Sequence, residues 1–287
     1  MKRIICLLLA LLLVLPAAAF AEDAEELDIE ETIEGEETGE EAAQGGGAEW
    51  DFPVALEDMR PDFVILANKD YLLDESFYVR PLVKVKKLKL NKDGSVKTEG
   101  VRWAVGSQMK LQEDCWKALV AMSDAAREDG YNLYLKSAYR SWKTQNTMYK
   151  NRLKKNHGKD DGWVSKAGAS DHQTGLGCDV IPKSWIKAAG MNSKMAKEPE
   201  CQWMAEHCQK YGFIIRYPED KEEITGIHYE PWHVRYVGIP AATYIMENGL
   251  CLEEFNGQLQ QAIEEYLAAG GDKKKVEAFI QKPTEEK

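Results

Sequence analysis

The apolar and polar residues of this chain recur with two different periods, which predict helices and strands in irregular order. Helix-type patterns cover residues 111–128, 143–155, 198–211, 241–248 and 253–269. Short apolar or alternating runs predict strands over residues 133–138, 176–181, 213–216 and 228–236. Because the two types do not alternate regularly, the sequence predicts an α+β fold with a small mixed or antiparallel sheet flanked by helices.

A β-hairpin is predicted over residues 83–105. Val83 and Val85 alternate with lysines, whereas Leu88 and Leu90 alternate one residue out of phase. Either a bulge resets the register or the strand is shorter than it looks. The Asn-Lys-Asp-Gly sequence that follows Leu90 is typical of a turn, and the second strand would return after it.

The first 48 residues have the composition of a targeting segment followed by a linker. Two basic residues precede an apolar run over residues 4–19, and a small-residue cleavage pattern ends at Ala21. This pattern predicts a signal peptide over residues 1–21, because the run is short for a membrane anchor. Residues 22–48 are acidic and end in glycines, which predicts a disordered linker. The sequence therefore predicts a secreted, extracytoplasmic protein.

The rest of the chain is predicted to form a domain over residues 49–252 and a C-terminal helical extension over residues 253–287. Apolar residues of the extension recur at helical spacing, which predicts packing on the domain surface. The formal net charge of −11 comes largely from residues 22–41, which hold twelve acidic residues and no Lys or Arg. The folded part is therefore close to neutral and lacks the basic field that nucleic-acid binding requires.

Five cysteines lie after the predicted cleavage site, and their spacing fits no zinc finger. An odd number leaves at least one free thiol, and the choice between five buried thiols and one disulfide stays open. Cys201 and Cys208 lie two helical turns apart, which is too far for a bond between them.

Two segments carry the residues that could perform chemistry. His172 and Asp179 lie seven residues apart around two glycines, so that a loop and the following strand could direct them to one point. Glu230 and His233 lie three residues apart and would face opposite ways in a regular strand. Because Pro231 cannot take an ordinary ladder position, we predict a bulge or kink there that brings both side chains together.

Two imidazoles and one carboxylate, with a second carboxylate nearby, are typical of a catalytic zinc site with an open fourth position. Bound zinc makes hydroxide available near neutral pH, and a nearby carboxylate can move the proton. Amide hydrolysis is the reaction that this set of groups predicts.

Three motifs follow one another along the chain: the Ser-Ala-Tyr-Arg-Ser sequence that contains Arg140, the Ser-x-His-x-x-Gly-x-x-x-Asp pattern and the Glu-Pro-Trp-His sequence. In type and order they resemble the motifs of VanY-like D-alanyl-D-alanine carboxypeptidases, a family in a wider group of zinc metallopeptidases that includes lysostaphin-like enzymes. The resemblance covers about residues 60–252. A Cys at position 178, before Asp179, departs from the small residue common in the family, and we expect Cys178 to pack in the core.

The resemblance implies a role for each matching residue. It implies that one zinc ion per chain is held at the sheet face by His172, Asp179 and His233, and that Glu230 is the catalytic base. It also implies that Arg140, Gln145 and Ser170 contact substrate. Arg140 could hold a terminal carboxylate or stabilise the charge that develops on the carbonyl oxygen, and the sequence does not separate these roles.

The function implied is hydrolysis of the terminal amide of peptidoglycan stem peptides by a monomer at the bacterial cell wall. An L,D-carboxypeptidase or an endopeptidase on the same scaffold is the alternative, and a non-catalytic wall-binding module is a further one. No nucleic-acid partner and no stable membrane insertion are expected after cleavage. The basic helix over residues 143–155 is either a solvated face or a contact for an anionic wall polymer.

Overall fold

The computed structural model describes residues 48–89, 91–93 and 95–285. The predicted signal peptide and nearly all of the predicted acidic linker lie outside the described residues. Among the described helices, none combines the length and apolar character needed to cross a bilayer.

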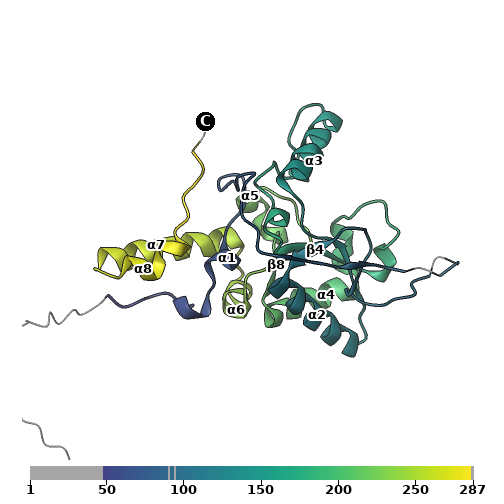
Figure 1. Cartoon of the computed structure of the whole chain (residues 1–287), viewed down its shortest axis with the longest axis horizontal. Coiled ribbons are helices and arrows are strands. Elements are labelled where there is room, and N and C mark those ends of the chain that lie inside the picture. The colour runs from purple at the N-terminus through teal and green to yellow at the C-terminus, as the bar shows by residue number, and fades with distance from the viewer. Residues whose placement is uncertain (1–47, 90, 94, 286–287) are drawn as a thin grey trace, which may run out of the picture. The chain divides into compact units, whose positions relative to one another are not determined.

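A mixed six-stranded sheet forms the centre of the fold (Figure 1). Its strands, in spatial order, are β2 (Lys86–Lys87), β3 (Trp103–Ala104), β5 (Leu133–Ser137), β6 (Gly177–Pro182), β8 (His233–Tyr236) and β7 (Phe213–Ile215). β2, β3 and β5 pair in parallel, whereas β5, β6, β8 and β7 pair antiparallel. A separate two-stranded sheet joins β1 (Leu82–Lys84) to β4 (Lys110–Gln112). The α+β prediction is therefore confirmed.

Helices surround the sheet. They are α1 (Pro61–Val64), α2 (Glu113–Glu128), α3 (Trp142–Lys155), α4 (Pro199–His207), α5 (Glu222–Thr225), α6 (Ile239–Glu247), α7 (Leu252–Ala268) and α8 (Lys273–Val276). The sequence predicted the longer ones to within a few residues. The predicted helix at 198–211 ends at His207 and continues as a 3-10 turn over Cys208–Tyr211.

Two clusters of buried apolar residues stabilise the packing of the helices and the sheet. In the first, the apolar face of α2, including Leu119 and Met122, packs with β5, β6 and α4. In the second, α6 and α7 pack with Ile214 of β7 and with the segment that precedes α1. Figure 1 shows α7 and α8 beside α1 and α6 on the side of the fold away from α3. The C-terminal helices thus share a core with the N-terminal part of the described chain.

The hairpin predicted over residues 83–105 is present only at its tip, because its two arms do not form an antiparallel strand pair. The turn after residue 90 is present, since the Asn91 amide donates to the Ser95 carbonyl oxygen. However, the first half forms two short strands. β1 pairs antiparallel with β4, which lies outside the predicted hairpin, and β2 pairs with β3 of the predicted second strand, but in parallel. The chain changes sheets at Val85. Val85 and Leu88 are therefore both buried despite their mismatched alternation.

The strand predicted over residues 228–236 is too long. Only His233–Tyr236 are paired, and the preceding residues form a turn in which the His233 amide donates to the Glu230 carbonyl oxygen at 3.0 Å. Pro231 occupies the second position of this turn, which suits its fixed φ angle. The kink predicted at Pro231 is confirmed.

All five described cysteines are free and buried, so no disulfide exists among them. Cys178 and Cys115 of α2 belong to the same core cluster. Because neighbouring strand residues point to opposite faces, Asp179 lies on the face of the sheet away from α2.

Gly212 offers a test of the packing between β8 and the chain that leads into β7. Its φ angle is +80°, and a Cβ atom there would lie 2.8 Å from Tyr236 Cε2 and 3.0 Å from the carbonyl carbon of Gly238. Gly130 also has a positive φ, but a Cβ atom there meets nothing within 4 Å. We expect Gly212→Ala to lower the free energy of unfolding by about 2–4 kcal/mol and Gly130→Ala by only about 1 kcal/mol. Urea denaturation of both variants measures the difference, and equal losses would contradict the packing described.

Candidate metal centre

Asp179 and His233 face each other across two neighbouring strands. They are directly paired residues of β6 and β8, so their side chains project from the same face of the sheet. His233 Nδ1 lies 3.2 Å from Asp179 Oδ1, and both side chains are almost fully buried. The register of one strand pair therefore brings together two residues that are 54 positions apart.

His172 reaches the same point from the loop before β6. It lies in a 3-10 turn over Asp171–Thr174 that ends at Gly175, whose φ angle is +73°. His172 Nδ1 lies 2.8 Å from the carbonyl oxygen of Ala138, which can only accept, so Nδ1 carries the proton. The lone pair of Nε2 is then directed at the centre, 3.6 Å from Asp179 Oδ1.

This arrangement requires the chain at Gly177 to lie very close to Asp171 and His233. A Cβ atom on Gly177 would lie 2.8 Å from Asp171 Cβ and 3.2 Å from His233 Nε2. Only glycine therefore allows the loop that carries His172 to lie against the strand that carries His233.

The three side chains are suited to a divalent cation. One ligand atom each from His172, Asp179 and His233 lies within 4.8 Å of the others, and all three residues are buried. Asp179 Oδ1 is buried and has no hydrogen-bond partner, although His233 Nδ1 is near it. A buried anionic oxygen of this kind requires a cation. Two imidazoles and one carboxylate match the ligand set of a catalytic zinc ion.

The protonation states of the two histidines differ. Burial, followed by the charge of Arg140, lowers the pKa of His172, so this imidazole is neutral and can act as a ligand. Burial also acts to lower the pKa of His233, but the carboxylates of Asp179 and Glu230 outweigh it and raise that pKa to about 10. In the metal-free protein, a proton on His233 therefore occupies the position between the two carboxylates.

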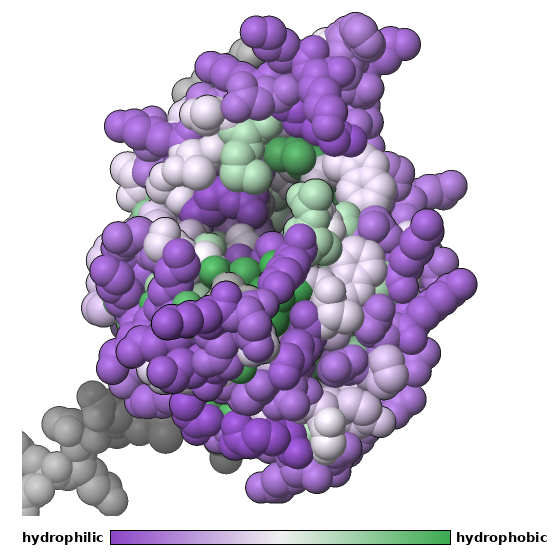
Figure 2. Space-filling view, turned by 90° about the vertical axis from the view of Figure 1, so that its right-hand side faces the viewer, coloured by the Kyte–Doolittle hydropathy of each residue, from purple (hydrophilic) through white to green (hydrophobic). Residues whose placement is uncertain are grey.

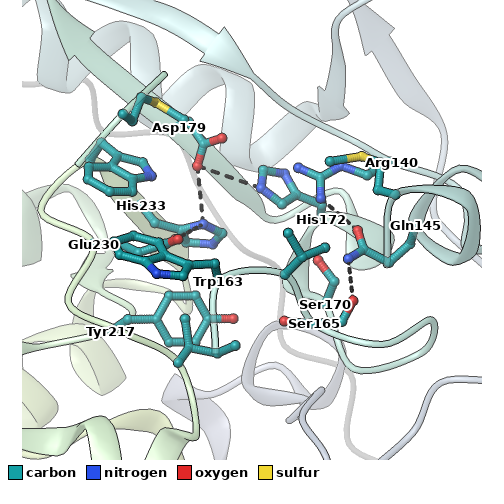
Figure 3. Close-up of a pocket in the computed structure, with 15 residues that line it drawn as sticks. Arg140, Gln145, Trp163, Ser165, Ser170, His172, Asp179, Tyr217, Glu230 and His233 are labelled. Atoms are coloured by element: carbon teal, nitrogen blue, oxygen red, sulfur yellow. Dashed lines mark hydrogen bonds and ion pairs between the residues drawn. The ribbon is translucent and has the colours of Figure 1, made fainter. Parts of the chain in front are cut away.

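Glu230 lies beside the three potential ligands. The turn at Pro231 places its Oε2 atom 3.4 Å from His233 Nδ1 (Figure 3). Burial raises the pKa of Glu230, because the charged form loses its hydration. A carboxylate with a raised pKa next to a metal site is suited to accept and return a proton near neutral pH.

Arg140 lies across the cavity from Glu230 (Figure 3). It follows β5, and its guanidinium donates to Gln145 Oε1 at 2.6 Å and lies 3.5 Å from Ser137 Oγ. Among the described residues it forms no ion pair with a carboxylate. Its charge is therefore available to an anionic group in the cavity.

Gln145 is almost completely buried on α3 and both ends of its amide are used. Oε1 accepts from Arg140, and Nε2 donates to the carbonyl oxygen of Ser165 at 2.6 Å. These bonds make Gln145 a support for Arg140. Ser170, also predicted to contact substrate, lines the same cavity. All seven predicted site residues thus lie around one cavity.

This cavity has a volume of about 200 Å³ and a mixed lining. Figure 2 shows a hollowed surface in which apolar residues lie next to hydrophilic ones. Sequence reasoning missed several of its lining residues: Met148, Trp163, Met191, Tyr217 and Ile227. Tyr217 could have been suspected, because it follows the predicted strand over 213–216. The other four come from α3 and from loops whose approach to the site has no sequence signature.

Two of the three remaining histidines, His228 and His207, have structural partners. His228 lies 3.0 Å from Glu222 Oε2 and packs against Trp163 at the edge of the cavity. His207 stacks on Trp203 of α4. Neither joins the group formed by His172, Asp179 and His233.

Comparison with known proteins places this site in a family. The profile described as "VanY: D-alanyl-D-alanine carboxypeptidase" matches residues 108–239, which contain every predicted site residue. The chain is 35% identical over 152 residues to a D-alanyl-D-alanine carboxypeptidase of Enterococcus faecium, covering 53% of this chain and 45% of the relative. It is 34% identical over 152 residues to a bifunctional D-Ala-D-Ala dipeptidase and carboxypeptidase, VanXYC, of Enterococcus gallinarum, covering 53% of this chain and 78% of the relative.

Among solved structures, the fold is similar to that of the LdcB LD-carboxypeptidase. The TM-score is 0.58 at 33% identity, and the match covers 69% of this chain and 87% of the other. The matched region spans about half the length of the first three curated relatives.

The protonation states predict how metal affinity depends on pH. His172 is already neutral, whereas His233 must lose its proton, so binding should release about one proton between pH 6 and 8. We therefore expect zinc affinity to rise about tenfold per pH unit over this range. Competition with a chromophoric chelator measures the slope, and the control variant His228→Gln should keep it. A slope near zero or near two would contradict the assignment.

Proposed function

Because the chain belongs to the VanY D-alanyl-D-alanine carboxypeptidase family, we propose that it is a zinc-dependent D-alanyl-D-alanine carboxypeptidase that acts on peptidoglycan stem peptides. The observation that carries the proposal is the meeting of two imidazoles and one carboxylate at a buried point beside the Glu230 carboxylate. The guanidinium of Arg140 lines the cavity and has no carboxylate partner among the described residues. This supports the proposal that the substrate has a free carboxylate.

His172, Asp179 and His233 would hold one zinc ion per chain. His172 would bind through Nε2, because its Nδ1 proton is donated to Ala138. His233 would bind through Nδ1, the nitrogen that faces the Asp179 carboxylate. When bound, zinc supplies the Lewis acidity that makes water a nucleophile near neutral pH.

Glu230 is the proposed base. It takes a proton from the water molecule as the water oxygen bonds to the carbonyl carbon of the terminal amide. It then gives that proton to the leaving nitrogen as the carbon–nitrogen bond breaks, so the terminal amino acid departs as a free amine. The raised pKa of Glu230 supports both halves of this cycle.

Arg140 is the proposed anchor for the negative charge of the substrate. It either pairs with the terminal carboxylate or stabilises the charge on the carbonyl oxygen as water adds. Gln145 would keep the guanidinium in place, and Ser170 would contact the peptide from the cavity wall.

The proposed site of action is outside the cytoplasm at the bacterial cell wall. The targeting pattern of residues 1–21 supports export, with residues 22–48 as a linker between that pattern and the domain. The stem peptide is the proposed partner, and the protein is proposed to work as a monomer.

An L,D-carboxypeptidase is the second candidate, because the LdcB LD-carboxypeptidase is structurally similar to this chain. The same residues would perform the same hydrolysis, and the two activities would differ in the stereochemistry of the residue before the cut. An endopeptidase would cut within the peptide instead.

Removal of the proposed base tests the mechanism. We expect Glu230→Gln to reduce kcat by about 100- to 10,000-fold, because the amide cannot accept the proton from water. The variant should still bind zinc, because the three ligands remain. Glu223→Gln, which alters an exposed glutamate seven residues earlier, should behave as the wild type. Near-normal turnover by Glu230→Gln would refute the assignment of the base.

Product analysis on defined stem peptides tests the specificity. We expect a pentapeptide that ends in D-Ala-D-Ala to lose one alanine, and the resulting tetrapeptide to remain intact. Mass spectrometry of the products distinguishes the candidates. Loss of alanine from the tetrapeptide alone would favour the L,D-carboxypeptidase, internal cleavage an endopeptidase, and no cleavage by the zinc-loaded protein a wall-binding module.

A further inference from the structure

We propose that Glu253, at the start of the C-terminal helix α7, is a positioning residue of the metal centre. This inference rests on the proposed metal-binding role of the centre. Glu253 lies outside residues 108–239, the part of the chain that matches the family profile. It acts through two buried residues, Arg216 and Asp171, the second of which directly precedes the ligand His172.

Asp171 is held by two arginines. Its Oδ2 atom accepts from Arg216 Nε at 2.7 Å, and its Oδ1 atom accepts from Arg235 Nη1 at 2.6 Å. All three side chains have no exposed surface. These bonds fix the orientation of the Asp171 carboxylate, and Asp171 directly precedes His172 in the chain.

Glu253 accepts the remaining hydrogen bonds of the Arg216 guanidinium. Its two carboxylate oxygens accept from Arg216 Nη1 and Nη2 at 2.8 and 2.7 Å, and Oε1 also accepts from Asn68 Nδ2. Every nitrogen of the Arg216 guanidinium is thereby used. The four charges of Asp171, Glu253, Arg216 and Arg235 sum to zero within the buried network.

The same network contacts the other side of the centre. The guanidinium of Arg216 lies 4.7 Å from the ring centroid of Tyr217, and that ring lies 5.0 Å from the ring of His233. Arg235 is two residues after His233 on β8, and its Nη2 atom donates to the carbonyl oxygens of Phe63 and Ile65. Both histidine ligands are thus next to residues that the network holds.

Loss of the Glu253 charge should act on the centre in two ways. An uncompensated positive charge would remain on buried Arg216. Removal of one partner of a buried ion pair lowers the stability of the folded protein. That charge would repel a bound cation at short range in a poorly screened interior. Arg216 would also be free to shift, which would release Asp171 and the loop that carries His172. Both effects lower metal affinity, as changes to groups that orient ligands do.

The test compares zinc affinity in Glu253→Gln and Glu254→Gln. Glu254 is the next residue of α7 and pairs with Lys221 at 3.1 Å rather than with Arg216, so it is a matched control. We expect Glu253→Gln to bind zinc about 10- to 100-fold more weakly in chelator competition, and Glu254→Gln to bind like the wild type. Circular dichroism of the metal-free proteins checks that each variant is folded.

Glu253→Asp keeps the charge but shortens the side chain, so its affinity should lie between those of the wild type and Glu253→Gln. It also serves as the test if Glu253→Gln does not fold. Wild-type zinc affinity in a folded Glu253→Gln or Glu253→Asp variant would overturn the inference, even if the melting temperature falls. Failure of the wild-type protein to bind zinc would instead refute the proposed function itself, so the two failures are distinguishable.

Discussion

The site depends on the register between two antiparallel strands, β6 and β8. Because Asp179 is paired directly with His233, both side chains project from the same face, and His233 Nδ1 lies 3.2 Å from Asp179 Oδ1. A slip of one residue would turn His233 towards the α2 face and bring Val234 into the centre. The neighbouring residues oppose such a slip, since Cys178 and Val234 are both buried in the core. The apolar face of the sheet therefore determines the geometry of its polar face.

The balance of charge among the carboxylates of the site explains why it is suited to a metal ion. Two buried carboxylates, Asp171 and Asp179, and the partly buried Glu230 lie close together, and they are compensated in two ways. Asp171 has two arginines, whereas Asp179 and Glu230 have only histidines as ion-pair partners within the described chain. Burial of carboxylates without full compensation is unfavourable, so a proton on His233 partly neutralises them in the metal-free protein. A divalent cation neutralises them more completely and uses the orphan oxygen of Asp179.

Local patterns predicted the parts of the fold and site that depend on neighbours in sequence. The helices followed from periodicity, and the kink at Pro231 followed from the geometry of proline. The pairing of β1 with β4 was not predictable, because the Asn-Lys-Asp-Gly turn suggested a nearer partner. The ion network of Asp171, Arg216 and Glu253 was missed for a different reason. Charged residues are rarely fully buried, so nothing in the local sequence distinguishes these from surface residues. Motif resemblance could predict the seven residues that line one cavity, but the residues that support them come from distant segments.

The buried ion network and the candidate metal centre differ in how their charges respond to pH. Arginine does not lose its proton at any physiological pH, so the network of Arg216 and Arg235 with Asp171 and Glu253 keeps its charge across the range in which an enzyme works. The centre uses histidine, whose protonation changes in that range and which can exchange a proton for a metal ion. A permanent, balanced ion network therefore supports a group of side chains whose charge, under the proposed function, changes when a metal ion binds. Because Glu253 of α7 belongs to this network, the C-terminal helix is linked through Arg216 to Asp171, the residue directly before the proposed ligand His172.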